Sequence, residues 1–168
     1  LVELTKRFYV QKKMEKIASD LDKLSKEQDK LSEERKENNT SEKQEDLNKQ
    51  FEKLQKDIEE LKKENKDLKA PMDIPVDKKE EEKVKEEMKG AKEELQKQNQ
   101  QGAKPKQKGA AQKMKQMAQQ MQSAMMQMQG QQMQEDARML RQILDNLLAF
   151  SFSQEDIMVA FKGLNRKS

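Results

Sequence analysis

The chain has 168 residues, of which 40% are charged, 32% are hydrophobic and only 4% are aromatic. This length fits one domain, but the apolar content is too low for a thick globular core, so the composition predicts either long solvated helices or disorder. The net charge of +3 is the small difference between 35 basic and 32 acidic residues, and it does not by itself indicate nucleic acid or an anionic membrane as a partner.

Missing residue types exclude several classes of function. Cys and His are both absent, which removes disulfides, thiolate nucleophiles and the usual zinc ligands. The five glycines stand singly, and none belongs to a GxxxxGK[ST] phosphate-binding loop. No run of about 18 apolar residues occurs, so we expect neither a membrane span nor a signal peptide in this chain. We expect no catalysis, no cofactor and no metal site.

Residues 3–69 predict an antiparallel coiled-coil hairpin. Two rows of apolar residues advance in alternating steps of three and four, as in a heptad seam. The first row contains Val10, Met14, Ile17, Leu21, Leu24 and Leu31, and the second contains Leu47, Phe51, Leu54, Ile58, Leu61 and Leu68. Folding the chain back at KENNTSEKQ brings the two rows into register. A polar residue in each row, Gln28 and Asn65, is then expected to face an apolar residue of the other row.

Capping signals mark the starts of the next two helices. Ser41 and Gln44 have the spacing of a capping box for the second arm of the hairpin. Pro71 and Pro75 predict a crossover over residues 70–77, in which Met72, Ile74 and Val76 form either a staple against the hairpin or a partner-docking strand. Asp77 is expected to cap a third helix over 78–99, with one narrow apolar stripe.

Residues 100–110 predict a basic flexible linker. Gly102, Pro105 and Gly109 are expected to interrupt any helix. Five lysines between positions 104 and 115 are followed by no acidic residue until Glu135. Such a segment can bind phosphates or anionic lipid, but it lacks aromatic residues for base stacking. We therefore expect a solvated linker and no nucleic-acid partner.

Residues 111–149 predict one long helix rich in Met and Gln. Its first apolar stripe contains Met114, Met117, Met121, Met125 and Met128. A second stripe, offset near Gly130, contains Met126, Met133, Ala137, Leu140, Leu144 and Leu147. Three interpretations stay open for the methionines. They fill an irregular helix interface, form a groove for variable apolar segments, or bind Cu(I) through their thioethers.

A short amphipathic helix is expected over residues 153–163. Ser153 and Asp156 have capping-box spacing, and Gly163 provides a C-terminal stop. The apolar residues expected to bind protein in this part of the chain are Phe150, Phe152, Ile157 and Phe161, which extend the set formed by the methionine and leucine stripes. This segment is expected to pack back on the end of the preceding helix, at residues 140–148, and the alternative is contact with a membrane surface.

Four segments together resemble a known family. LTKRFYVQKKMEKIASDLDKLSKEQDKLSEE, FEKLQKDIEELKKENKDLKAPMDIP, AAQKMKQMAQQMQSAMMQMQ and EDARMLRQILDNLLAFSFSQEDIM are similar to the coiled-coil portion of a large Bacteroidota family of envelope proteins whose domain has no known function. The leucine seams are generic, whereas APMDIP, the Met/Gln helix and LDNLLAFSFSQEDI are more distinctive. The resemblance implies an internal piece of a longer, membrane-anchored protein that faces the periplasm. Some members are labelled ATPases, but this chain has no Walker motif.

The sequence therefore predicts an all-α fold, extended rather than globular, in which a long hairpin is followed by further long helices. We expect a non-catalytic coiled-coil scaffold whose partners are other protein chains, the remainder of its own longer chain, or further copies of itself. The alternative is a holdase-like or cargo-binding module that uses the methionine-rich helix face. A membrane is expected to be contacted only through regions outside this chain.

Overall fold

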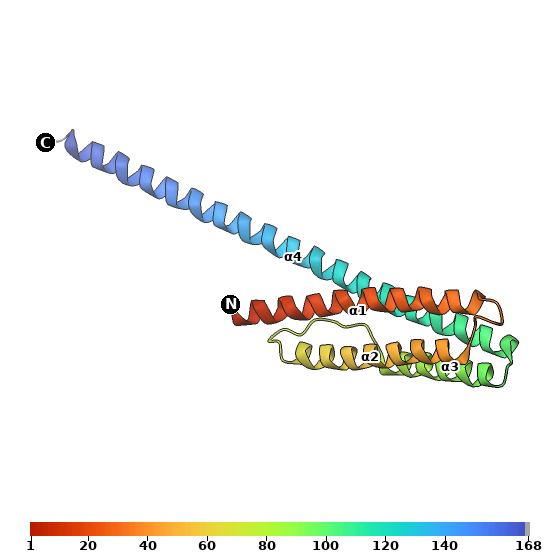
Figure 1. The fold of residues 1–168 in the computed structure, drawn as a ribbon. Helices are drawn as coiled ribbons and strands as arrows, with labels where there is room; N and C mark the ends of the chain where they lie inside the picture. The colour runs from red at the N-terminus through yellow and green to blue at the C-terminus, as the bar shows by residue number, and fades with distance from the viewer. Residues whose placement is uncertain (167–168) are drawn as a thin grey trace. The chain divides into compact units, whose positions relative to one another are not determined.

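The computed structural model describes residues 1–166, which form four α-helices and no strand. The helices are α1 (Val2–Glu33), α2 (Ser41–Lys66), α3 (Lys78–Gln96) and α4 (Gln100–Asn165) (Figure 1). This confirms the predicted all-α fold, while an extended shape stays a prediction. The chain divides into an N-terminal unit, Leu1–Met126, and a C-terminal unit, Gln127–Ser168, and α4 contributes to both.

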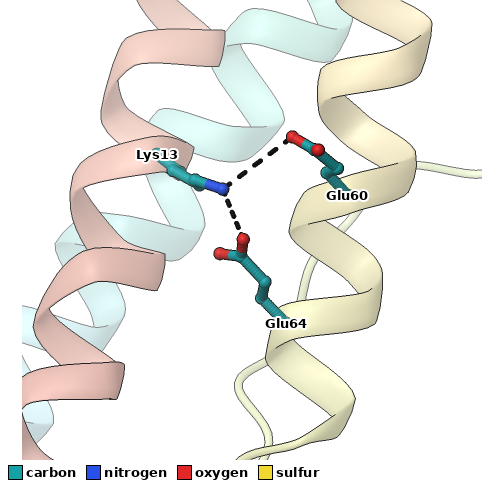
Figure 2. A network of polar contacts seen from close by, with 3 residues as sticks. All are labelled: Lys13, Glu60 and Glu64. Atoms are coloured by element: carbon teal, nitrogen blue, oxygen red, sulfur yellow. Dashed lines mark hydrogen bonds and ion pairs between the residues drawn. The ribbon is translucent and has the colours of Figure 1, made fainter.

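Helices α1 and α2 lie antiparallel. Lys13 of α1 donates a hydrogen bond to Glu64 of α2, and its Nζ lies 3.9 Å from a carboxylate oxygen of Glu60 (Figure 2). The bond to Glu64 raises the pKa of Lys13, because it stabilises the charged ammonium. Glu3 of α1 accepts a hydrogen bond of 2.7 Å from the backbone N–H of Lys69, just past the end of α2. Early residues of α1 thus meet late residues of α2.

The other neighbouring helices of the N-terminal unit are also antiparallel. Glu45 near the start of α2 pairs with Lys92 near the end of α3 at 2.6 Å, and Lys62 near the end of α2 pairs with Glu81 near the start of α3 at 3.4 Å. Glu87 of α3 pairs with Lys113 of α4. Ser25 of α1 donates a hydrogen bond of 2.8 Å to the Ala111 carbonyl of α4. The N-terminal unit is therefore an up-down-up-down bundle of α1, α2, α3 and the first part of α4.

The core of this bundle consists of the heptad rows that the sequence displays. Both hairpin rows are buried, including Met14, Leu21, Phe51, Ile58 and Leu61, each exposed by at most 1%. Helix α3 contributes its predicted stripe, and the first part of α4 contributes small residues and methionines. These buried residues are Val84, Met88, Ala91 and Leu95 of α3, and Ala103, Ala110, Ala111, Met114, Met117, Ala118 and Met121 of α4. The apolar face of the hairpin is thus covered by the same chain.

One layer of this core consists of side-chain amides. Gln28 and Gln44 donate to each other's carbonyls at 2.9 and 2.7 Å, and Asn39 and Gln107 form a second reciprocal pair at 2.9 and 2.8 Å. Gln107 also donates to Gln44 at 2.9 Å, which joins the two pairs. The sequence predicts an apolar residue opposite Gln28, and the structure adds an amide partner, Gln44, that the prediction did not include. Buried amides require partners, and α1, α2, α4 and the α1–α2 loop together supply them.

The connections between helices are held by side-chain caps. Thr40, not Ser41, caps α2, because its hydroxyl accepts a hydrogen bond of 3.3 Å from the Lys43 N–H. The predicted Ser41–Gln44 capping box is wrong, since Gln44 points into the amide layer. Asp77 caps α3 by accepting a hydrogen bond of 3.2 Å from the Lys79 N–H.

The crossover between α2 and α3 packs onto the bundle. Met72 and Val76 are buried, as the staple interpretation of this segment predicts. Asn65 holds the crossover by donating to the Met72 carbonyl at 2.7 Å and accepting from the Met72 N–H at 2.9 Å. The second polar seam residue, Asn65, thus also has polar partners, which the crossover backbone supplies.

The prediction of a flexible linker over residues 100–110 is wrong, because this segment is the start of α4. Asn99 caps the helix, since its Oδ1 accepts a hydrogen bond of 3.1 Å from the Gly102 N–H. Pro105 removes one backbone donor, but Ala103 and Gln107 on either side are fully buried. Packing against the bundle therefore outweighs the low helix propensity of Gly and Pro.

The glycines of this segment allow α4 to lie close to α3. A Cβ at Gly109 would come within 2.5 Å of a Glu87 carboxylate oxygen, and one at Gly102 within 2.7 Å of a Glu94 carboxylate oxygen. A larger residue at either position would require these carboxylates to move. Gly102 and Gly109, which look like helix breakers in the sequence, thus lie where α4 and side chains of α3 come close together.

A separate helix over residues 153–163 is also a wrong prediction. Helix α4 continues through Phe150 and Phe152 to Asn165, and Ser153 lies inside it. The physical reason is that no Gly or Pro occurs between Gly130 and Gly163, so nothing in this stretch ends the helix. The predicted Met/Gln-rich helix over 111–149 is the middle of α4.

Candidate interaction surface

From residue 133 to residue 164 the C-terminal unit is continuous helix, and its large apolar side chains are exposed. The exposed residues that the sequence predicted as interaction sites are Met133, Leu140, Leu144, Leu147, Phe150, Phe152, Ile157 and Phe161. Each of these side chains is exposed by at least 58%. Exposed apolar groups that gather in a contiguous area are typical of interaction sites.

Most of the apolar residues fall on one side of the helix, in three adjacent rows with a spacing of seven residues. The central row contains Leu140, Leu147, Gln154 and Phe161. One flanking row contains Ile143, Phe150, Ile157 and Leu164, and the other contains Leu144, Ser151 and Met158. We call these three rows the C-terminal face. Residues three, four and seven positions apart are neighbours on a helix, so the face is continuous over about four heptads.

Charged residues avoid this face. Between residues 137 and 164 the charged side chains are Arg138, Arg141, Asp145, Glu155, Asp156 and Lys162. With Leu140 as position a of a heptad, all six occupy positions b, c and f, which point away from an a/d seam. Helix α4 in the C-terminal unit therefore has a broad uncharged side and a charged side, which is the pattern of a helix that packs against other helices.

The predicted methionine stripe is divided between core and surface. Met114, Met117 and Met121 are buried in the N-terminal bundle, exposed by at most 1%, whereas Met125 and Met128 are half-buried. A cargo-binding groove that includes Met121 would need that side chain to be accessible. Met126 and Met133, from the second stripe, are exposed instead.

Several residues of the C-terminal face are absent from the set predicted from sequence. These are Ile143, Met158 and Leu164, together with Met139, Leu148 and Val159 elsewhere on the same helix. The seven-residue spacing from Ile143 to Leu164 identifies two of the first three, and Met158 follows Leu144 and Ser151 in the other flanking row. Both spacings are hidden when the segment is divided into two helices. A further exposed group, Leu1, Leu4 and Phe8, lies at the start of α1.

The lysines near the start of α4 are partly engaged within the N-terminal unit. Lys108 lies 3.7 Å from Glu33 of α1, and Lys113 pairs with Glu87 of α3. Elsewhere in this unit, a hydrogen bond from Lys92 lowers the pKa of Glu45. These contacts place the basic segment on the bundle surface, facing carboxylates.

Within residues 1–166 no three acidic side chains lie close enough together to hold a metal ion. In the same range, no helix combines the length and the apolar content needed to cross a bilayer. Comparisons with protein-family models, curated proteins and solved structures found no match to this chain.

Proposed function

We propose that this chain is a non-catalytic structural segment of a membrane-anchored envelope protein. It acts as a coiled-coil scaffold that packs against further copies of itself or against partner proteins. In this proposal the N-terminal bundle is the rigid support, and the C-terminal face is the surface that binds protein. Catalysis has no part in it.

The observation that carries the proposal is the contrast in burial along α4. Met114, Met117 and Met121 are covered by the bundle, whereas the apolar rows beyond residue 133 are exposed. Exposing large apolar side chains to water is unfavourable by about 1.5–3 kcal/mol for each one that a partner would bury. A face of this size therefore favours association with protein.

The proposed location rests on a different argument. The resemblance of the four segments to the Bacteroidota envelope family supports a membrane-anchored protein whose anchor lies outside this chain. The helices of residues 1–166 contribute no span of their own.

Photo-crosslinking in the cells that make the protein tests the scaffold function. A benzoyl-phenylalanine residue at position 150, on the C-terminal face, should form adducts with protein, whether another copy of the chain or a different one. The matched control is the same group at position 152, a phenylalanine that is similarly exposed but lies at heptad position f. Equal adduct formation at both positions, or none at position 150, would contradict the proposed function.

A further inference from the structure

The C-terminal face contains two heptad seams that share one row. The central row forms a seam with the row of Ile143, in steps of three and four, and a second seam with the row of Leu144. A helix in a two-stranded coiled coil needs one seam. A helix with two adjacent seams contacts two neighbouring helices, as in bundles of three or more strands.

The other helices of residues 1–166 offer no second apolar row of this length to pair with the face. The heptad rows of α1, α2 and α3, and the methionine row at the start of α4, are already buried in the N-terminal bundle. Within residues 1–166, no other exposed apolar row extends over four heptads. A second copy of the chain provides a row of the same length and spacing.

The buried area is sufficient for stable association. The face has nine large apolar side chains, namely Leu140, Ile143, Leu144, Leu147, Phe150, Ile157, Met158, Phe161 and Leu164, which are exposed by 48–69%. At roughly 60–120 Å² for each side chain that becomes buried, one copy would bury on the order of 800 Å². That is about the area each partner contributes to a stable interface of standard size.

Gln154 indicates the orientation of the copies. It is the only polar residue of the central row, and a buried amide without a partner costs about 1–3 kcal/mol. In a parallel, in-register arrangement Gln154 lies level with Gln154 of the next copy, and the two amides can bond to each other. The same chain already contains such a pair, since Gln28 and Gln44 exchange two hydrogen bonds in the N-terminal core. An antiparallel arrangement centred on the face would place Gln154 level with Phe150.

A membrane surface fits the face less well. Residues 127–168 contain five acidic and five basic side chains, so the charged side of the helix has no excess of Lys and Arg to attract anionic lipid.

We propose that the C-terminal face assembles in parallel and in register with the same face of further copies, to form a bundle of more than two helices. This inference rests on the scaffold function proposed above and identifies its partner as the chain itself. The shared central row lies at the bundle axis, and the flanking rows contact the neighbours on either side.

Light scattering on the purified 168-residue chain, across a dilution series, tests the self-association. The expected mass is that of three or more chains of 19.7 kDa. Changing Ile143→Asp and Ile157→Asp together should reduce the mass to that of one chain, because both charges enter a seam. The matched control, Phe152→Asp with Val159→Asp, places the same charges at position f and should leave the mass unchanged. A wild-type chain that is monomeric at every concentration would overturn the inference.

Cysteine crosslinking tests the orientation without disturbing the flanking rows. The chain contains no cysteine, so single Leu140→Cys and Gln154→Cys variants each report one position of the central row. Both should form disulfide-linked copies under mild oxidation, whereas Phe152→Cys should not. Antiparallel copies would place position 140 level with 164, so failure of Leu140→Cys to crosslink would overturn the parallel arrangement.

The self-association and the scaffold function can fail separately. A monomeric chain whose position 150 crosslinks to a different protein in cells would end the self-association and support the scaffold function. A chain that oligomerises only when residues of the C-terminal face are intact, and crosslinks to its own copies, supports both.

Discussion

The N-terminal and C-terminal units contain the same kind of apolar heptad rows but differ in what covers them. In the N-terminal unit, Leu21, Phe51, Val84 and Met117 come from four helix segments and bury one another. In the C-terminal unit, rows of equal regularity remain exposed. The difference shows that heptad spacing predicts which side of a helix is apolar, whereas burial depends on whether the chain returns to cover that side.

Each of the two units has polar residues within its apolar rows. Gln28 and Asn65 interrupt apolar rows in the N-terminal unit, and both have hydrogen-bond partners within the chain. Gln154 interrupts the central row of the C-terminal face in the same way. A polar seam residue commonly selects register and strand number, so the N-terminal unit shows how the chain satisfies such a residue when its partner is present.

The largest effect is expected from the methionines of α4, because some are buried in the bundle and others on the same helix are exposed. Replacing Met114, Met117 and Met121 together by Gln should unfold the N-terminal bundle. Each change removes about 1.5–3 kcal/mol of apolar burial and buries an amide that loses its hydrogen bonds to water. Replacing Met126, Met133 and Met139, which are exposed, should leave the bundle folded. Circular dichroism during urea unfolding measures both, and equal stability of the two variants would contradict the division of α4.

A smaller effect is expected from the amide layer. Changing Gln107→Ala removes both side-chain hydrogen bonds of Asn39 and one hydrogen bond of Gln44. The unfolding free energy should fall by about 1–3 kcal/mol, because buried amides lose hydrogen bonds. Gln119→Ala, at an exposed position of the same helix, is the matched control and should change it by less than about 0.5 kcal/mol. A similar loss of unfolding free energy in both variants would mean that the hydrogen bonds of Gln107 add nothing to stability beyond helix propensity.

The sequence predicted the helical fold and the core faces well, because these follow from local periodicity. Val84, Met88 and the hairpin rows lie in the core, and Asp77 caps α3 as its position before Lys78 indicates. The crossover near Met72 was also foreseeable, since two prolines and three apolar residues define it.

The errors came from features that depend on distant partners. The local sequence of Gly102, Pro105 and Gly109 predicts a linker, but this segment is helical and buries Ala103 and Gln107 in the bundle. The local sequence places Gln44 in a capping box, but its side chain forms hydrogen bonds with Gln28 and Gln107. The candidate site was found in part, because the leucine stripe was visible, while the row of Ile143 was lost when the helix was divided near Phe152.

The two units predict opposite responses to filling a helical glycine. Gly130 has open space around its Cβ position, so Gly130→Ala should stabilise this part of α4 by about 0.5–1 kcal/mol through higher helix propensity. Gly109→Ala should gain nothing or be destabilising, because its Cβ meets the Glu87 carboxylate that pairs with Lys113. Hydrogen exchange of the amides around each position measures the change. Equal gains at both positions would show that the approach of α3 to α4 is not tight.

The smallest effect is expected from Glu81, a nearly buried carboxylate of the N-terminal unit. Burial raises its pKa from the ordinary 4.5, because desolvation disfavours the charged form, while Lys62 at 3.4 Å acts in the opposite direction. Between the ordinary and the raised value the folded state binds more protons than the unfolded state, so this group's contribution to the unfolding free energy falls as pH rises.

Glu81→Gln removes this titration and isolates the contribution of the group. The unfolding free energy of the wild type, minus that of the variant, should decrease as pH rises through that window and stay constant above it. Lys62→Met should make this decrease larger, because it removes the positive charge that lowers the pKa of Glu81. Urea unfolding at a series of pH values measures both differences, and parallel profiles for wild type and Glu81→Gln would mean that the Glu81 carboxylate is hydrated. In that case water would reach the ion pair of Lys62 and Glu81 between α2 and α3. The N-terminal unit would then be packed less tightly than its buried apolar rows indicate.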